Sequence, residues 1–145
     1  MASAKTFFLE IVSPERKVFG DDVEFGIFPG SEGLLGILPD HAPILSMLSP
    51  GEIKITKNSR SSYYAISGGF LEVSANKATV AADTCESAEQ INKEEALAEK
   101  KAALAEVEKN KEEKENLLLA QKRLKMAEIR ISVAEKAVTA NQTEK

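Results

Sequence analysis

The stretch ATVAADTCESAEQINKEEALAEK, from Ala78 to Lys100, contains the point at which the chain changes from one kind of structure to another. All eight Gly, all five Pro and all eight aromatic residues of the 145-residue chain lie at or before Phe70, and the 60 residues after Cys85 contain none of them. Charged side chains make up 17 of the first 85 residues but 25 of the last 60. The sequence therefore predicts two parts of different structure, over 1–85 and 86–145.

Before this boundary, short segments are rich in the aromatic and β-branched residues that favour strands. Turn signals such as GDD, PGSEG and KNSRSS separate these segments at short intervals. The expected strands are 7–12, 16–19, 23–28, 52–56, 63–66, 69–73 and 78–82. Short strands of this kind, with no helical periodicity between them, predict an antiparallel β-sandwich or barrel of about eight to ten strands.

After the boundary, the apolar residues follow a helical period. The second of two expected helices carries one stripe with alternating spacings of three and four: Leu117, Ala120, Leu124, Ala127, Ile131, Ala134 and Val138. An earlier helix is expected over about 94–109, with a weaker, alanine-rich face. The segment KNKEEKEN (109–116) has no apolar residue and predicts the turn between them. The second part is therefore expected to be an antiparallel two-helix hairpin.

The packing of this hairpin is expected to be marginal. Its four large stripe residues, Leu117, Leu124, Ile131 and Val138, would contribute at most about 6 to 12 kcal/mol together on full burial, before the entropy of ordering is subtracted. A marginal element with its own apolar stripe can exchange one packing partner for another, as a conformational switch requires. A static two-helix cap explains the same pattern equally well, and the sequence leaves both interpretations open.

No catalytic, cofactor-binding or metal-binding constellation is apparent. A single His and a single Cys rule out paired-His and thiolate metal motifs, and neither GxxxxGK nor GxGxxG occurs. We interpret His41 as a surface or interface residue rather than a general base oriented by Asp40, because no nucleophile motif accompanies it and adjacent residues of an extended segment point to opposite faces. Cys85 is interpreted as a structural thiol.

Charge and hydropathy restrict the possible partners. The net charge is -4 and there is no basic block, so a nucleic-acid partner is not expected. The segment MASAKTFFLEI is not typical of a signal peptide, and no stretch is apolar enough to span a bilayer. We therefore expect a cytosolic chain that meets a membrane only through a complex.

Several segments resemble one family in sequence and in order. They are GSEGLLGILPDHAPIL (30–45), PGEIKI (50–55), SGGFLEV (67–73), ATVAAD (78–83) and INKEEA (91–96), and they are similar to the epsilon subunit of bacterial F-type ATP synthases. The resemblance implies a ten-stranded β-sandwich followed by a helical hairpin, in a non-catalytic subunit at the foot of the central stalk, peripheral to the cytoplasmic face of the bacterial membrane.

The resemblance also implies partners. The family's sandwich binds the gamma subunit and rests on the c-subunit ring, and all three turn as one rotor. Its helices can extend along gamma into the catalytic alpha/beta hexamer and block rotation in the hydrolysis direction. By rise alone, a continuous helix from Ala88 to Val138 would span roughly 75 Å, which is sufficient for that role.

Position by position, the resemblance assigns two interfaces. The c-ring side would include Ser31, Glu32, Gly33, Leu34 and His41, and the gamma side would include Pro43, Gly68, Gly69 and Phe70. The glycines and prolines of 30–45 predict a loop that Leu35 and Ile37 anchor in the core. The alternative is that Leu35, Ile37 and Phe70 are all core residues, and that the glycines only permit tight turns.

In the extended state, the basic residues of the last helix would face an acidic segment of the beta subunits: Lys122, Arg123, Lys125, Arg130 and Lys136. A solvated helix face explains them equally well, since Glu128 and Glu135 share the helix.

Two segments depart from the family pattern. Some members bind ATP through a helix entry IDxxRA, in which Asn92 and Glu95 of this chain replace the aspartate and the arginine. Asn92 and Glu95 form a capping box, but a carboxylate now stands where a cation would attract phosphate, so weak or absent ATP binding is expected. Asp40 stands where the family usually has glycine, so either the turn does not need a positive φ or Asp tolerates one.

Overall fold

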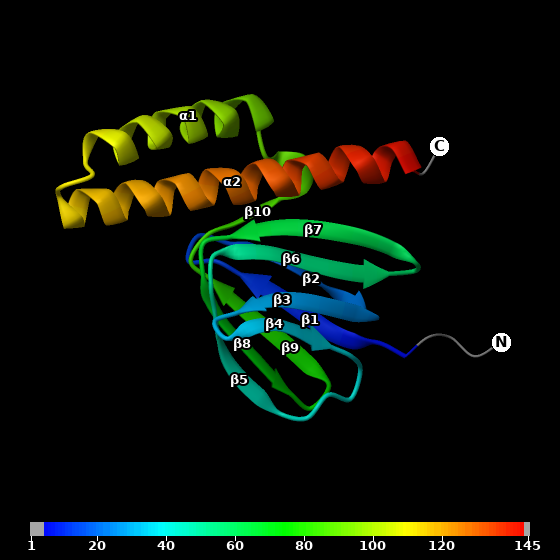
Figure 1. Cartoon of the computed structure of the whole chain (residues 1–145). Coiled ribbons are helices and arrows are strands. Elements are labelled where there is room, and N and C mark those ends of the chain that lie inside the picture. Colours follow the sequence, from blue (N-terminus) through cyan, green and yellow to red (C-terminus); the bar gives the residue numbers. More distant parts are fainter. Residues whose placement is uncertain (1–4, 144–145) are drawn as a thin grey trace. The chain divides into compact units, whose positions relative to one another are not determined.

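The structure is a computed structural model that describes residues 5–143, with side chains described over 5–137. The chain divides into two compact units, Met1–Ser87 and Ala88–Lys145. The first holds ten strands, and the second holds a short 3-10 helix, η1 (Ala88–Gln90), and two α-helices, α1 (Lys93–Lys109) and α2 (Lys114–Thr143) (Figure 1). The predicted β-sandwich followed by a helical hairpin is confirmed.

The strands form one highly curved sheet. They are β1 (Phe7–Val12), β2 (Lys17–Val23), β3 (Phe25–Gly30), β4 (Gly33–Ile37), β5 (Ile44–Leu48), β6 (Gly51–Lys57), β7 (Arg60–Ile66), β8 (Gly69–Ser74), β9 (Lys77–Ala82) and β10 (Cys85–Ser87). Their order is β10-β7-β6-β3-β5-β8-β9-β1-β2, with β4 paired to β3. Every pairing is antiparallel except that of β1 with β9, which is parallel and which the sequence did not predict.

The segment 30–45 differs from its prediction. It was expected to be a loop, but Gly33–Ile37 forms β4 and pairs with β3 over its full length. Its last two residues begin β5, which pairs with β8. Backbone pairing with neighbouring strands outweighs the glycines, whose low strand propensity is only a weak preference.

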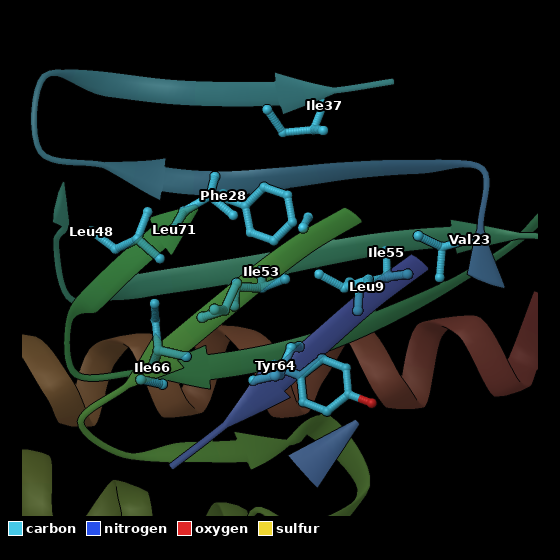
Figure 2. Packing of buried hydrophobic residues seen from close by; sticks show 14 of the residues in the cluster. Leu9, Val23, Phe28, Ile37, Leu48, Ile53, Ile55, Tyr64, Ile66 and Leu71 are labelled. Carbon is cyan, nitrogen blue, oxygen red and sulfur yellow. The ribbon is translucent and has the colours of Figure 1, made fainter. Parts of the chain in front are cut away.

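The core of the sandwich comes from the inward-facing residues of alternate positions. In β1, Phe7, Leu9 and Ile11 are at most 2 % exposed, while the residues between them are half-buried. Figure 2 shows how such residues from several strands converge, among them Phe28, Ile53 and Leu71, all fully buried. Each large side chain buried in this way contributes about 1.5 to 3 kcal/mol. The sandwich therefore offers rigid support for residues on its outer face.

The hairpin is closed by caps and by alanine packing. The Asn92 side chain accepts a hydrogen bond from the Glu95 backbone N–H at 3.0 Å, which is the first half of the predicted capping box. At the other end of α1, the Asn110 N–H donates to the Glu106 carbonyl at 3.0 Å. The turn follows at 110–113, so α2 begins inside the segment that was expected to be the turn.

Burial along α2 is centred on small residues of the predicted stripe. Ala120, Ala127 and Ala134 are buried, and so are Val133 and Ala137 beside the stripe. The larger Leu117, Leu124 and Ile131 are only half-buried, and the side chain of Val138 lies outside the described residues. The full-burial estimate made from the sequence is therefore an upper limit.

Candidate functional site

The tip of the β3–β4 hairpin presents four of the residues assigned to the c-ring side. Ser31 and Glu32 form its turn, and Gly33 has a φ of 132°. Leu34 is 76 % exposed although it lies in a strand. The Ser31 N–H donates to the Met47 carbonyl at 3.0 Å, which fixes the tip against β5. A groove of about 190 Å³ runs over this tip, lined by Gly30, Ser31, Glu32, Gly33, Leu34, Leu35 and Ser46.

The same strand is anchored by its inward-facing residues. Ile37 is 1 % exposed, and Leu35 packs partly buried against the core. Both residues hold β4 in place, as expected. Period-two alternation then turns Leu34 outward, so an exposed apolar side chain stands on a rigid element.

His41 lies outside this groove, in the segment that follows β4. Its Nδ1 donates to the Ala42 carbonyl at 2.6 Å. The neighbouring Asp40 carboxylate is 3.9 Å from the Lys5 ammonium, and the Asp40 N–H donates to the Asn76 side-chain oxygen at 2.8 Å. Asp40 has a φ of 63°, so the turn does need a positive φ and Asp tolerates it. These contacts pair the His41 ring with a backbone carbonyl and the Asp40 carboxylate with Lys5, so they do not join the two side chains as a base and its orienting carboxylate.

An apolar face covers the outer side of β5, β8 and β9. We use this name for Leu45, Met47, Phe70 and Ala81. Met47 pairs with Phe70 in register, and Phe70 pairs with Ala81. Leu45 is 73 %, Met47 59 % and Phe70 50 % exposed. The alternative interpretation of Phe70 as a core residue is wrong, because β8 turns Leu71 and Val73 inward instead.

Leu45 and Met47 were missed by the sequence reasoning. The segment ILSML is apolar at both odd and even positions, so its pattern does not show which side chains face the core. Its pairing with β8 decides the matter, since Leu48 lies opposite Gly69 and is buried. Leu45 and Met47 then point to the other side of the sheet.

Gly68 and Gly69 support this face rather than form part of it. Both are buried, with φ values of 125° and 149°. A Cβ atom on Gly69 would lie 2.1 Å from the Ala81 carbonyl oxygen. The two glycines therefore let the chain pass close to β9 and deliver Phe70 to the surface. Pro43, the other residue assigned to the gamma side, is exposed just before β5.

The basic residues of α2 do not form one face. At about 100° per residue, Lys122, Lys125 and Lys136 lie on one side of the helix, while Arg123 and Arg130 lie about a third of a turn away. Arg130 Nη1 donates to Glu99 Oε2 of α1 at 2.8 Å. Arg123 lines a groove of about 470 Å³ between the helices, together with Glu99, Ala102, Ala103, Glu106 and Met126.

Comparison of the sequence with known protein families identifies the family of this chain. Residues 6–88 match the family model described as ATP synthase, Delta/Epsilon chain, beta-sandwich domain. The chain belongs to this family. The matched range contains all ten strands, and with them the hairpin tip and the apolar face.

Curated relatives within the family carry the name ATP synthase epsilon chain. The protein of Desulfitobacterium hafniense is 47 % identical over 97 residues, which cover 67 % of this chain and 74 % of that one. The protein of Herpetosiphon aurantiacus is 49 % identical over 88 residues, which cover 61 % and 65 %.

Solved structures show that the fold is shared. A chain in the cryo-EM structure of the Euglena gracilis mitochondrial ATP synthase (OSCP/F1/c-ring) has a TM-score of 0.77 at 18 % identity, covering 95 % of this chain and 84 % of that one. A chain in the central stalk/c-ring structure of the Tetrahymena thermophila mitochondrial ATP synthase has a TM-score of 0.54 at 18 % identity, covering 94 % and 98 %.

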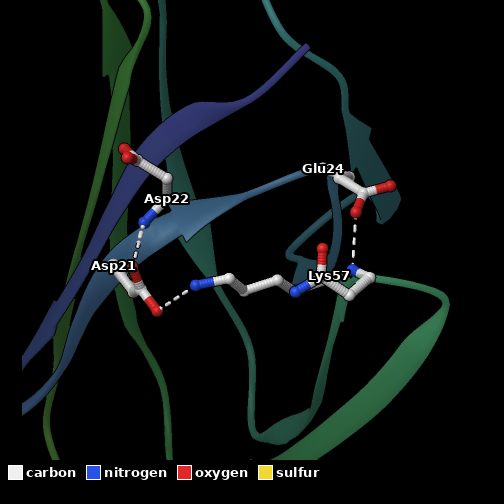
Figure 3. A network of polar contacts seen from close by, with 5 residues as sticks. Asp21, Asp22, Glu24 and Lys57 are labelled. Atoms are coloured by element: carbon white, nitrogen blue, oxygen red, sulfur yellow. Dashed lines mark hydrogen bonds and ion pairs between the residues drawn. The ribbon is translucent and has the colours of Figure 1, made fainter. Parts of the chain in front are cut away.

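Other polar clusters of this family member are structural. Asp21 of β2 accepts hydrogen bonds from the Lys57 ammonium and the Asp22 N–H, which hold the pKa of Asp21 below its usual value (Figure 3). The Asn58 N–H donates to Glu24 close by. These contacts join β2 and the chain before β3 to the β6–β7 turn, and so help to close the sheet.

The remaining candidate features are the single cysteine, the acidic side chains and the helices. Burial raises the pKa of the Cys85 thiol to about 11, so the thiol is protonated and unreactive at neutral pH. Within the part of the chain that the structure describes, no three His, Cys, Asp or Glu side chains are grouped to hold a metal ion. None of the described helices is long and apolar enough to cross a membrane.

Proposed function

We propose that this chain is the epsilon subunit in the central stalk of a bacterial ATP synthase. It has no catalytic role of its own and couples ion-driven rotation of the c-ring and gamma to ATP synthesis. Its hairpin inhibits ATP hydrolysis. The observation that carries the proposal is the match of 6–88 to the family's β-sandwich domain. The complex would hold the chain at the cytoplasmic face of the membrane.

The two outward surfaces of the sandwich suit two docking partners. The hairpin tip, with Ser31, Glu32 and the exposed Leu34, would rest on the polar loops of the c-ring, with His41 nearby. The apolar face and Pro43 would contact gamma, with Gly68 and Gly69 shaping the turn that presents Phe70. Exposed apolar side chains on adjacent rigid strands support this assignment, since such patches mark protein interfaces.

The hairpin supports a regulatory role through its weak packing. Its buried interface is rich in alanine, which removes little apolar area from water. When it opens, α2 would offer Lys122, Arg123, Lys125, Arg130 and Lys136 to an acidic segment of the catalytic beta subunits. The folded hairpin and the extended form would then be alternative states of one element.

The decisive experiment compares the whole ATP synthase containing the full chain with the same complex containing a chain that ends at Ala88. The inhibitory role predicts a higher rate of ATP hydrolysis for the truncated chain, and an unchanged rate would contradict it.

Docking is tested separately by the variant Met47→Glu, which should lower co-purification of gamma and c subunits with the chain. A Thr79→Glu variant on the same outer surface of β9, beyond the apolar face, is the matched control.

An independent sandwich adaptor with a coiled-coil tail is the alternative function. It predicts that neither gamma nor c subunits co-purify with the unaltered chain. Recovery of the chain with both subunits would exclude that alternative.

A further inference from the structure

A short polar contact between the two helices of the hairpin joins Arg130 to Glu99. Arg130 Nη1 lies 2.8 Å from Glu99 Oε2, and the Arg130 side chain is only 12 % exposed. A second ion pair, from Lys93 Nζ to Glu135 Oε1, measures 3.4 Å, with side chains 45 % and 56 % exposed. The first pair is shorter and better shielded from water, so it is the less screened of the two.

The packing around this pair adds little to hold the helices together. The buried residues of α1 are Ala96 and Ala103. Those of the stripe on α2 are alanines as well, and Val133 is a larger side chain of α2 that is also fully buried. The groove beside the pair, lined by Glu99, Ala102 and Arg123 among others, leaves space between the helices that no side chain fills. Small side chains bury little apolar area, which leaves the charged contacts a role in holding the hairpin closed.

We infer that Arg130 has two competing acidic partners: Glu99 when the hairpin is folded, and the catalytic subunits when it is extended. This inference rests on the proposed function, because the second partner belongs to the extended state. A guanidinium forms strong charge-assisted hydrogen bonds with carboxylates, and the Glu99 contact can form only while α1 and α2 are packed together. Opening of the hairpin must therefore break the Glu99 contact before Arg130 can make the other.

The two halves of the pair then act in opposite directions. Glu99 favours only the folded hairpin, so its loss increases the extended population and strengthens inhibition. Arg130 favours both states, so its loss also loosens the folded hairpin but removes a contact that the extended state needs. A ligand or contact shifts an equilibrium only through its different affinities for the two states.

The folded population is measured directly on the full chain. Spin labels at the exposed positions of Lys101 on α1 and Gln121 on α2, in a Cys85→Ala background, report the distance between the helices by pulsed electron resonance. Glu99→Gln and Arg130→Gln should each lower the ratio of short to long distances by about three- to ten-fold. A ratio unchanged in both variants would overturn the inference.

ATP hydrolysis by the assembled complex gives the second readout. Glu99→Gln should lower the hydrolysis rate, and Arg130→Gln should raise it, although both variants open the hairpin. Changes in the same direction would overturn the competition. The exchanged pair Glu99→Arg with Arg130→Glu should restore the short distance and still show weakened inhibition, because the cation now lies on α1.

Two controls separate the possible failures. Glu108→Gln removes an exposed ion pair with Lys111 at the hairpin turn, 3.0 Å long, and should change neither readout. If truncation at Ala88 leaves hydrolysis unchanged, the proposed inhibitory role of the hairpin fails. If truncation raises hydrolysis but Glu99→Gln leaves the distances between the spin labels unchanged, only the role of the Arg130–Glu99 pair fails.

Discussion

Asn76 fixes the segment after β4 through two hydrogen bonds. Its side-chain oxygen accepts from the Asp40 N–H at 2.8 Å, and its amide nitrogen donates to the Thr6 carbonyl at 3.0 Å. Asn76 itself has a φ of 59°. One residue in the β8–β9 turn therefore ties together three segments that are far apart in the sequence.

Replacement of Asn76 by Gly keeps the positive φ available and removes only the side-chain bonds. We expect Asn76→Gly to lower the free energy of unfolding by about 1 to 2 kcal/mol, since two backbone groups lose their partner. Urea denaturation followed by circular dichroism measures the change. Asn58→Gly is the matched control, because Asn58 also has a positive φ, 52°, and its bond to Glu24 uses the backbone N–H. Equal losses in both variants would contradict the role of the Asn76 side chain.

Cys85 makes the free energy of unfolding depend on pH in the alkaline range. Its native pKa is raised to about 11 by burial, whereas an unfolded thiol titrates near about 8.5. The native state therefore holds the proton more tightly than the unfolded state does. The resulting contribution to the free energy of unfolding is fully present below about pH 8.5 and is lost as pH rises toward 11. Denaturation of the unaltered chain and of Cys85→Ala between pH 7 and 10.5 should show stability falling more steeply for the unaltered chain.

The same pKa predicts the reactivity of this thiol. At pH 8 the native thiolate fraction is smaller than that of an unfolded thiol by on the order of 100-fold. Alkylation by iodoacetamide should therefore be slow in the native protein and fast in urea. Equal rates in the two conditions would show that Cys85 is not held in the core.

Among the elements, the five-residue strand β4 contains one residue expected to stabilise the fold and another expected to contact a partner. Ile37 is buried at 1 % exposure and Leu34 is 76 % exposed. We expect Ile37→Ala to cost about 2 to 4 kcal/mol of unfolding free energy through the cavity it leaves. Leu34→Ala should change stability by less than about 0.5 kcal/mol but reduce association with the c-ring. The prediction fails if chemical denaturation shows similar losses for both variants.

The residues at the first turn of α1 are the basis for the prediction that the chain binds ATP weakly or not at all. Asn92 caps the helix, and Glu94 and Glu95 place two carboxylates where the N-terminal dipole would otherwise attract phosphate. In a titration of the full chain with millimolar ATP, followed by backbone NMR, we expect no saturable shifts over 91–98. Saturable shifts with micromolar affinity would contradict this expectation. Glu95→Arg is the informative companion variant, since it restores the cation of the family pattern.

The sequence predicted the elements with high strand propensity or a clear helical period. FFLEIV is rich in aromatic and β-branched residues and predicted β1 with the bounds that the structure has, and the helical period predicted α1 to within one residue. β4 and β5 were not predicted because GLLGI and ILSML place apolar residues on both faces, where hydrophobic periodicity carries no information. For the same reason the apolar face was recognised only at Phe70. Pairing between distant strands decided the rest.

At the scale of the whole molecule, the sandwich has a core of its own. Every residue of its buried cluster lies between Phe7 and Cys85, and residues 1–87 form one compact unit. We expect a chain of residues 1–87 to fold alone and to unfold in one cooperative transition. A dispersed NMR spectrum and coincident thermal transitions in near- and far-ultraviolet circular dichroism would test this. A molten, ANS-binding state would contradict it.

The parallel pairing of β1 with β9 has a consequence for how the protein is made. Phe8 lies opposite Lys77 and Val12 opposite Ala81. The strand β1 therefore leaves the ribosome well before β9, which has to follow before the second edge of β1 is covered. Closure of the sheet must follow synthesis of almost the entire sandwich, and such distant contacts slow folding to about milliseconds or longer. Until then β1 exposes an unpaired backbone edge and apolar side chains. Both features make the nascent chain a candidate for chaperone binding during translation.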